Sequence, residues 1–182
     1  MTELLHLQGI FERLRKGHHL SREDEPEFSA LDANFERYMA YFAPLGLTLV
    51  RHPRDFFYFA PASDDVPSDA LPRIAVFSYI LVDHASSSGR TIDDFFFSQH
   101  FIVTHLPHFN LDRYRDLLKQ VDVRDVAGLK RVLHSMKALN WIQFMSGGTD
   151  EFRFLRPFYR MLDKCIEVCE SRLDDESAKP SE

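Results

Sequence analysis

Two stretches of this chain follow the same plan, an amphipathic helix that runs straight into an aromatic-rich pair of strands. In the first, residues 34–42 predict a helix, and residues 47–52 and 56–59 predict two strands joined by a turn. In the second, residues 129–139 predict the helix, and residues 141–145 and 152–155 predict the strands. Helical spacing and period-two alternation support these assignments. Because a winged-helix domain ends this way, the repeat predicts two such domains in tandem, a class that binds other macromolecules.

The remaining sequence supplies the other helices that each domain needs. The apolar spacing predicts helices over residues 3–16 and from Ser21 to about Leu31, and again over residues 69–85, 92–104 and 111–121. The residues expected to cap helices are Ser21, Asp32, Asp69, Thr91 with Asp94, and either Asp122 or Asp125. The fold is therefore expected to be mainly α with small β-hairpins, of the α+β class. We expect a first winged-helix domain at 1–61, a linker at 62–68, a second winged-helix domain at 69–157, a C-terminal helix at 158–172 and a disordered tail at 173–182.

Composition excludes several classes of protein. An apolar share of 45% with 17 phenylalanines is ample for real cores, whereas the apolar runs are too short to span a bilayer. The N-terminus lacks the features of a signal peptide, so we expect a cytosolic protein. A net charge of −6 disfavours a protein that coats DNA by itself. Residues 110–164 nevertheless hold 11 Lys/Arg against 7 Asp/Glu, a local charge of +4 that leaves −10 for the rest.

The two helices that precede the hairpins differ in charge. The first, residues 32–45, offers Arg37 against Asp32 and Glu36, and is unsuited to DNA. The second, residues 124–140, carries four basic side chains against one acid, and two more arginines follow in its wing. The second domain could therefore touch phosphates, although a solvated basic face is an equally simple interpretation. The candidate DNA contacts are Lys130, Arg131, Lys137, Arg153 and Arg156.

No residue pattern in the sequence predicts catalysis or a cofactor. The chain has no glycine-rich phosphate loop, nucleophile elbow or zinc-ligand spacing. The histidines His100, His105 and His108 could be considered metal ligands, but Pro107 interrupts the helix that would align the last two. We therefore expect no enzyme activity, no cofactor and no metal.

Three consecutive phenylalanines raise the question of an interface. Phe95, Phe96 and Phe97 point about 100° apart on a helix and cannot all face one core. Either the chain covers them from several sides, or some meet a partner. The candidate partner contacts are Phe95, Phe96, Phe97 and Ile102, and on this basis we expect a homodimer.

Several segments resemble the MukE and MksE family. They are residues 17–24, 41–42 and 49–61 around the first wing, and residues 133–144 and 152–153 at the second helix–wing junction. The resemblance covers most of residues 5–160. The absence of a long acidic C-terminal extension favours the shorter MksE type.

The resemblance implies a role as well as a fold. Family members are non-enzymatic accessory subunits of bacterial condensin-like SMC complexes. They dimerise and bind a kleisin of the MukF/MksF kind, which in turn bridges an SMC ATPase of the MukB/MksB kind. The resemblance also implies weak, non-specific DNA contact within the complex and a cytoplasmic, nucleoid-associated location. It implies chromosome segregation and DNA condensation, or defence against plasmids, as the biological role.

Two other functions remain as alternatives. A stand-alone winged-helix transcription regulator would need a basic recognition helix, which the acidic first helix argues against. An enzyme or metal protein would have to use His100, His105 and His108.

Overall fold

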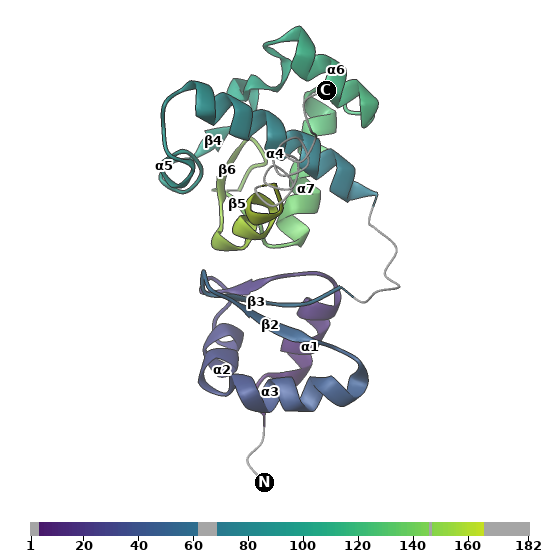
Figure 1. Cartoon of the computed structure of the whole chain (residues 1–182), viewed down its shortest axis with the longest axis vertical. Helices are drawn as coiled ribbons and strands as arrows, with labels where there is room; N and C mark the ends of the chain where they lie inside the picture. Colours follow the sequence, from purple (N-terminus) through teal and green to yellow (C-terminus); the bar gives the residue numbers. More distant parts are fainter. Residues whose placement is uncertain (1–3, 62–68, 146, 166–182) are drawn as a thin grey trace, which may run out of the picture.

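The computed structural model describes residues 4–61, 69–145 and 147–165, and it contains two stacked units (Figure 1). The first unit is built in the order helix, strand, two helices, hairpin. Its elements are α1 (Leu7–Arg15), β1 (Leu20–Ser21), α2 (Glu27–Ala33), α3 (Phe35–Phe42), η1 (Ala43–Leu45), β2 (Leu49–His52) and β3 (Phe56–Phe59). Their strands form one antiparallel sheet in the order β1-β3-β2.

The second unit repeats this order behind a longer helical start. Its elements are α4 (Ala70–Ser87), α5 (Ile92–Phe97), β4 (Phe101–Ile102), η2 (Val103–His105), η3 (Pro107–Phe109), α6 (Asp112–Gln120), α7 (Val126–Ala138), β5 (Ile142–Phe144), β6 (Glu151–Phe154) and η4 (Arg156–Phe158). Residues 159–165 are also helical. The second sheet has the order β4-β6-β5, so in both units the last strand lies in the middle.

The predicted α+β class is confirmed, and so is each hairpin. The sheets differ from the expectation in having a third strand. Leu20 pairs with Phe57 in the first sheet, and Phe101 pairs with Phe152 in the second. A strand of two residues is too short to show an alternating pattern, which is why the sequence did not predict β1 and β4.

Several helix boundaries differ from the prediction. Ser21 lies in β1 rather than capping a helix, and Asp32 lies inside α2. The helix expected over residues 92–104 ends at Phe97. At the end of this helix, the side chain of Gln99 donates from Nε2 to the carbonyl of Phe95 at 2.8 Å. The chain then extends into β4, where main-chain pairing with β6 replaces helical hydrogen bonds.

The predicted caps had mixed outcomes. Thr91 accepts a hydrogen bond from the Asp94 backbone at 3.1 Å, and Asp125 accepts one from the Gly128 backbone at 2.7 Å. These two caps are confirmed. Asp69 occupies the N-cap position of α4 without a side-chain cap bond.

The phenylalanine run is largely covered by the chain itself, and its contact with a partner stays a prediction. Phe95 and Phe96 are buried, and the Phe96 ring packs edge-on against Phe154 at 5.0 Å. Phe97 is half-buried and stacks on Tyr159 at 4.3 Å. Phe95 packs against Phe101 at 5.6 Å, so every ring of the run has an aromatic neighbour. Of the four candidate partner contacts, Ile102 alone is exposed, at 43%.

Buried side chains form two hydrophobic clusters, one centred on each sheet. Phe56 of β3 belongs to the cluster of the second unit, so the two clusters meet. The domain boundaries remain a prediction. The expected linker at 62–68 and tail at 173–182 lie outside the described residues, as does part of the helix expected at 158–172. Among the described helices, none is both long and apolar enough to cross a membrane.

The position of Phe96 gives a test of this packing. Phe96→Ala should lower the free energy of unfolding by about 3–5 kcal/mol, because it opens a cavity inside a ring of aromatic side chains. Ile102→Ala, on the neighbouring exposed site, should cost under about 0.5 kcal/mol. Urea denaturation of both variants would measure the difference, and equal costs would contradict the burial of α5.

Candidate functional site

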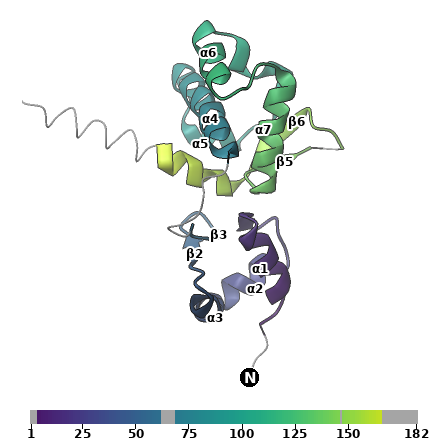
Figure 2. The same ribbon diagram turned by 90° about the vertical axis from the view of Figure 1, so that its right-hand side faces the viewer.

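One basic stripe of α7 lies against the second hairpin. Lys130, His134 and Lys137 are four and seven residues apart, so they share one face of the helix. Each contacts the hairpin: Lys130 Nζ lies 2.5 Å from Asp150 Oδ1, and the His134 ring centroid lies 5.2 Å from that of Phe144. Lys137 Nζ lies 5.8 Å from the Phe144 ring. We call this surface the α7–hairpin face, and Figure 2 shows the hairpin projecting beside α7.

The charges on this face are not equally available. Lys130 is paired with Asp150, which offsets its charge, and its side chain is 34% exposed. Lys137 is exposed and has only the ring of Phe144 as a neighbour in the described contacts. A phosphate approaching this face would therefore meet Lys137 without first breaking an ion pair.

The other three candidate DNA contacts lie elsewhere. Arg131 is about 100° around α7 from Lys130 and lines a cavity beside α4. Arg153 pairs with Gln143 across the hairpin and donates to its Oε1 at 2.8 and 2.9 Å. Gln143 and Phe144 are adjacent, so their side chains point to opposite faces of the sheet. Arg156 lies in η4, exposed. The structure therefore does not gather the five basic residues into one patch.

The corresponding helix of the first unit presents a different surface. Tyr38 and Phe42 are its buried residues, while Met39 is 38% and Tyr41 48% exposed. Leu45 in η1 follows at 59% exposure. This helix thus leaves large apolar side chains in solvent. We call Met39, Tyr41 and Leu45 the α3 apolar surface.

A buried histidine joins the two units. His19 is 2% exposed, and its ring Nδ1 lies 3.0 Å from the carbonyl oxygen of Leu139. Its Nε2 lies 2.8 Å from Nη1 of Arg160. Since a carbonyl can only accept and a guanidinium can only donate, a neutral ring with its proton on Nδ1 satisfies both partners. Burial, and then the charge of Arg160, lowers the pKa of His19 to about 3.

A second polar cluster lies beside it. Asn140 Nδ2 donates to the carbonyl of His19 at 2.8 Å and to Asp24 Oδ2 at 2.6 Å. Asp24 is also 3.0 Å from His18 Nε2 and 2.9 Å from Arg13 Nη1. Burial alone would raise the pKa of Asp24, but the hydrogen bonds it accepts and the charges of His18 and Arg13 lower it overall. Asn140 has φ 61°, a left-handed conformation that asparagine tolerates well.

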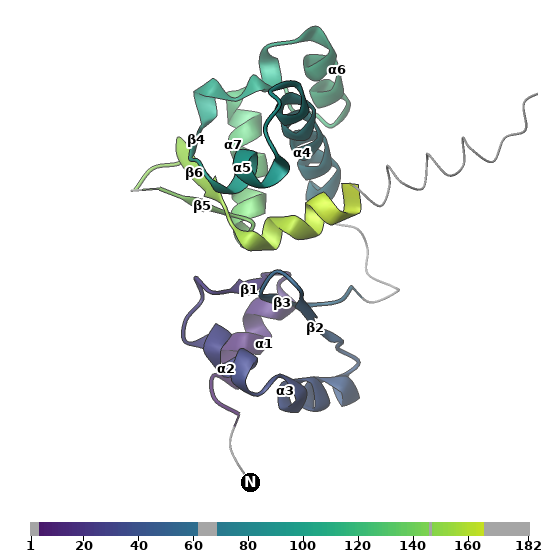
Figure 3. The same cartoon turned by 60° about the vertical axis from the view of Figure 1, so that its left-hand side comes forward.

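The helix at 159–165 completes this contact between the units, which we call the inter-unit seam (Figure 3). The Arg160 guanidinium lies 4.2 Å from the Tyr58 ring, and the Arg54 guanidinium 3.9 Å from the Tyr159 ring. Tyr159 donates to Asp93 at 2.7 Å. Burial, and then that hydrogen bond, raises the pKa of Tyr159 to about 12. The first hairpin, α5 and the last described helix are therefore joined to one another.

The three histidines considered as metal ligands do not meet. His100 lies 3.3 Å from Glu151, and His105 is exposed. His108 is buried, stacks on Phe77 at 4.3 Å and has Nε2 3.1 Å from the Phe77 carbonyl. Burial lowers its pKa to about 4. Within the described part of the chain, no three His, Cys, Asp or Glu residues are grouped as metal ligands would be.

Sequence reasoning did not identify the seam. His18, His19 and Asn140 belong to segments that carried the family resemblance, but no local pattern joins residues 120 positions apart. The sequence signal that could have pointed to the inter-unit seam was the concentration of polar side chains at the two junctions between a helix and a strand.

Comparison with known families supports the resemblance. The family model described as condensin complex protein MksE matches residues 5–166, a range that includes both units. No curated protein matches the chain.

The neutral His19 predicts loss of stability in acid. The unfolded histidine titrates near pH 6.5, whereas the folded one titrates near pH 3. Between these values the unfolded state binds more protons, so the stabilisation is complete above pH 6.5 and is lost as the pH falls toward 3. At pH 5 the loss should be about 2 kcal/mol.

His19→Gln, which cannot titrate, should remove that part of the change between pH 7 and pH 5. His105→Gln, on an exposed site, should keep the wild-type pH dependence. Urea denaturation at pH 7 and at pH 5 would measure the change in the free energy of unfolding for each variant. If His19→Gln kept the full loss at pH 5, the neutral state assigned to His19 would be wrong.

Proposed function

Because this chain belongs to the MksE family of condensin complex proteins, we propose that it is a non-catalytic subunit that binds a kleisin and contacts DNA weakly. Family membership indicates a subunit of a condensin-like SMC complex. The single observation that supports the finer proposal is the contrast between two equivalent helices. α3 exposes apolar side chains, whereas α7 exposes basic ones.

We interpret both units as winged helices. Each contains a short strand, two helices and a hairpin, with the last strand in the middle of the sheet. In such domains the helix before the hairpin is the one that approaches DNA. In this interpretation α3 and α7 occupy equivalent positions, and their surfaces indicate what each unit binds.

The first unit is our candidate for the kleisin surface. Tyr41 and Leu45 are about half exposed, and the helix bears a single arginine, Arg37, against Glu36. Exposed aromatic and aliphatic side chains of this kind serve as anchors for a protein partner that orders on binding. A kleisin segment would cover them.

The second unit is our candidate for DNA contact through the α7–hairpin face. Lys130 and Lys137 can meet phosphates there, and phosphate contacts position a protein on DNA without reading its sequence. With a net charge of −6, the isolated chain should bind poorly. Binding should appear when the SMC heads hold the duplex against this face.

The rest of the proposal follows the family. The SMC ATPase, reached through the kleisin, would supply ATP hydrolysis, and the complex would act in the cytoplasm on the nucleoid. A homodimer remains part of the proposal, but the burial of Phe95 and Phe96 removes the sequence argument for it. The role would be chromosome organisation and segregation, or defence against plasmids. No observation favours a stand-alone transcription regulator.

The kleisin surface can be tested with charges on α3. Tyr41→Asp combined with Leu45→Asp should weaken kleisin binding about tenfold or more, because it places charges on the apolar anchors. Isothermal titration calorimetry with the MksF-like kleisin would measure it. Tyr79→Asp is the control, because Tyr79 is 54% exposed on α4 of the other unit. Wild-type affinity in the double variant, with an unchanged fold, would exclude α3 as the surface.

The DNA contact can be tested in the assembled complex. Lys130→Glu with Lys137→Glu should weaken DNA binding and reduce its log–log salt dependence by about one unit for each phosphate that a lysine no longer neutralises. Arg15→Glu with Lys16→Glu makes the same charge change at the C-terminal end of α1. Fluorescence anisotropy at several salt concentrations would compare them. Equal affinity and equal salt dependence for the two variants would leave the α7–hairpin face as a solvated surface.

A further inference from the structure

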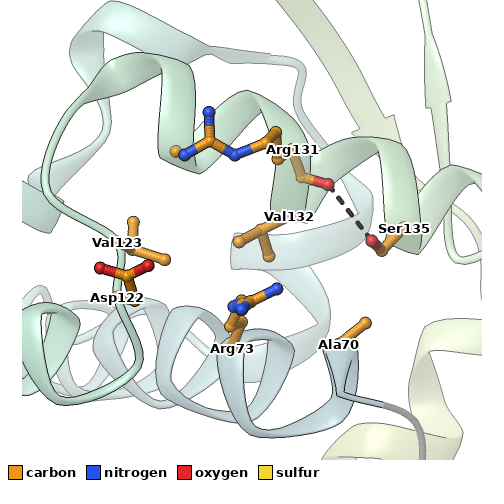
Figure 4. A pocket seen from close by; sticks show the side chains of 8 residues that line it. Ala70, Arg73, Asp122, Val123, Arg131, Val132 and Ser135 are labelled. Atoms are coloured by element: carbon orange, nitrogen blue, oxygen red, sulfur yellow. Dashed lines mark hydrogen bonds between the residues drawn. The ribbon is translucent and has the colours of Figure 1, made fainter.

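A small polar cavity lies between α4 and α7, away from the α7–hairpin face. It measures about 100 Å³ and is lined by Ala70, Arg73, Asp122, Val123, Gly128, Arg131, Val132 and Ser135. Figure 4 shows Arg73 rising from α4 and Arg131 extending from α7 on the opposite wall, with the Asp122–Val123 segment closing one end.

Among the residues that the structure describes, two arginines at this cavity lack the acidic partner that their neighbours have. Arg73 uses its Nε to donate to the carbonyl of Val121 at 3.2 Å. Within the described residues, the guanidinium groups of Arg73 and Arg131 form no ion pair. By contrast, the surrounding cations are paired: Arg113 with Asp83, Arg115 with Asp112, Lys119 with Asp116 and Arg124 with Asp122.

Asp122 is the one acid that lines the cavity, and it does not neutralise the two arginines. Asp122 Oδ1 lies 3.2 Å from Arg124 Nε, and both side chains are more than 70% exposed at the rim. Arg73 and Arg131 therefore carry positive charge that no described carboxylate pairs with directly. The Asp125 carboxylate already caps the first turn of α7 by accepting from the Gly128 backbone at 2.7 Å, so the two arginines supply the positive charge of this cavity.

The size and chemistry of the cavity select a class of ligand. A volume of about 100 Å³ is large enough to admit a small tetrahedral oxyanion. Guanidinium groups present several N–H donors in a planar fork that matches phosphate oxygens.

We propose that this cavity is a phosphate-binding site in which Arg73 and Arg131 hold the oxyanion from opposite walls. The phosphate group can come from free phosphate or from a DNA backbone that runs along α4. The site does not depend on the proposed kleisin or DNA roles, because Arg131 faces away from Lys130 and Lys137 on α7.

Binding to the isolated full-length chain is the primary test. Inorganic phosphate is titrated against a sodium chloride control of equal ionic strength, and backbone amide NMR shifts are followed. Phosphate should shift amides of residues 70–73 and 122–135, with saturation. Arg131→Gln should weaken the apparent affinity about tenfold, the loss expected for one charge-assisted hydrogen bond. Arg73→Gln should act in the same way.

Arg22→Gln is the matched control, because it removes the same charge from an exposed position in the first unit. It should retain wild-type phosphate affinity. Arg131 has no ion pair to lose among the described residues, so Arg131→Gln should keep the fold, as the NMR spectrum would show. Linear, unsaturated shifts, or equal affinity in Arg131→Gln and Arg22→Gln, would overturn the proposal.

A second arm identifies the source of the phosphate group. A short DNA duplex is added to the phosphate-saturated chain in low salt. Competition that Arg131→Gln abolishes and Lys137→Gln preserves would assign the site to the DNA backbone. Saturable phosphate binding without competition would support the site with free phosphate as its ligand.

Discussion

The neutral ring of His19 fixes the arrangement on which the rest of this structure depends. It accepts from Arg160 and donates to the carbonyl of Leu139, two groups that no charged histidine could satisfy together. Arg160 is held in turn over the ring of Tyr58. Burial lowers the pKa of the Arg160 guanidinium, so a charge is retained there at some cost in solvation. The contact therefore specifies one relative position of the two units.

This fixed position explains how one small chain can present two different surfaces. The sheet of the first unit faces the second unit through the inter-unit seam, and α3 lies at the far side of that sheet (Figure 1). The apolar side chains of α3 and η1 therefore stay exposed, where a partner could reach them. In the second unit, α7 lies beside its hairpin with one basic stripe toward the hairpin, and Arg131 lines the cavity between α7 and α4. A subunit of a condensin-like complex could thus engage protein and phosphate at separate places.

Sequence periodicity predicted some of these surfaces and missed others for clear reasons. Lys130 and Lys137, two of the candidate DNA contacts, lie on one face of α7 because the helical repeat is local and regular. Arg153 was grouped with them although strand alternation turns it to the other side of the sheet from Phe144. The run at residues 95–97 was ambiguous, since its rings needed neighbours from β6 and from the helix at 159–165, which lie far along the chain.

The sequence by itself determined the two hairpins, the cap at Thr91, the α+β class and the family, and it narrowed the cap of α7 to Asp122 or Asp125. Each of these depends on residues within one or two turns, or on patterns shared with relatives. Only the tertiary structure decided the third strand of each sheet, the burial of Phe95 and Phe96, and the cavity that both Arg73 and Arg131 line. It also decided the pairing of His19 with Arg160, which are 141 residues apart. Such contacts form when packing closes long loops, and loop closure leaves no periodic trace in the amino-acid sequence.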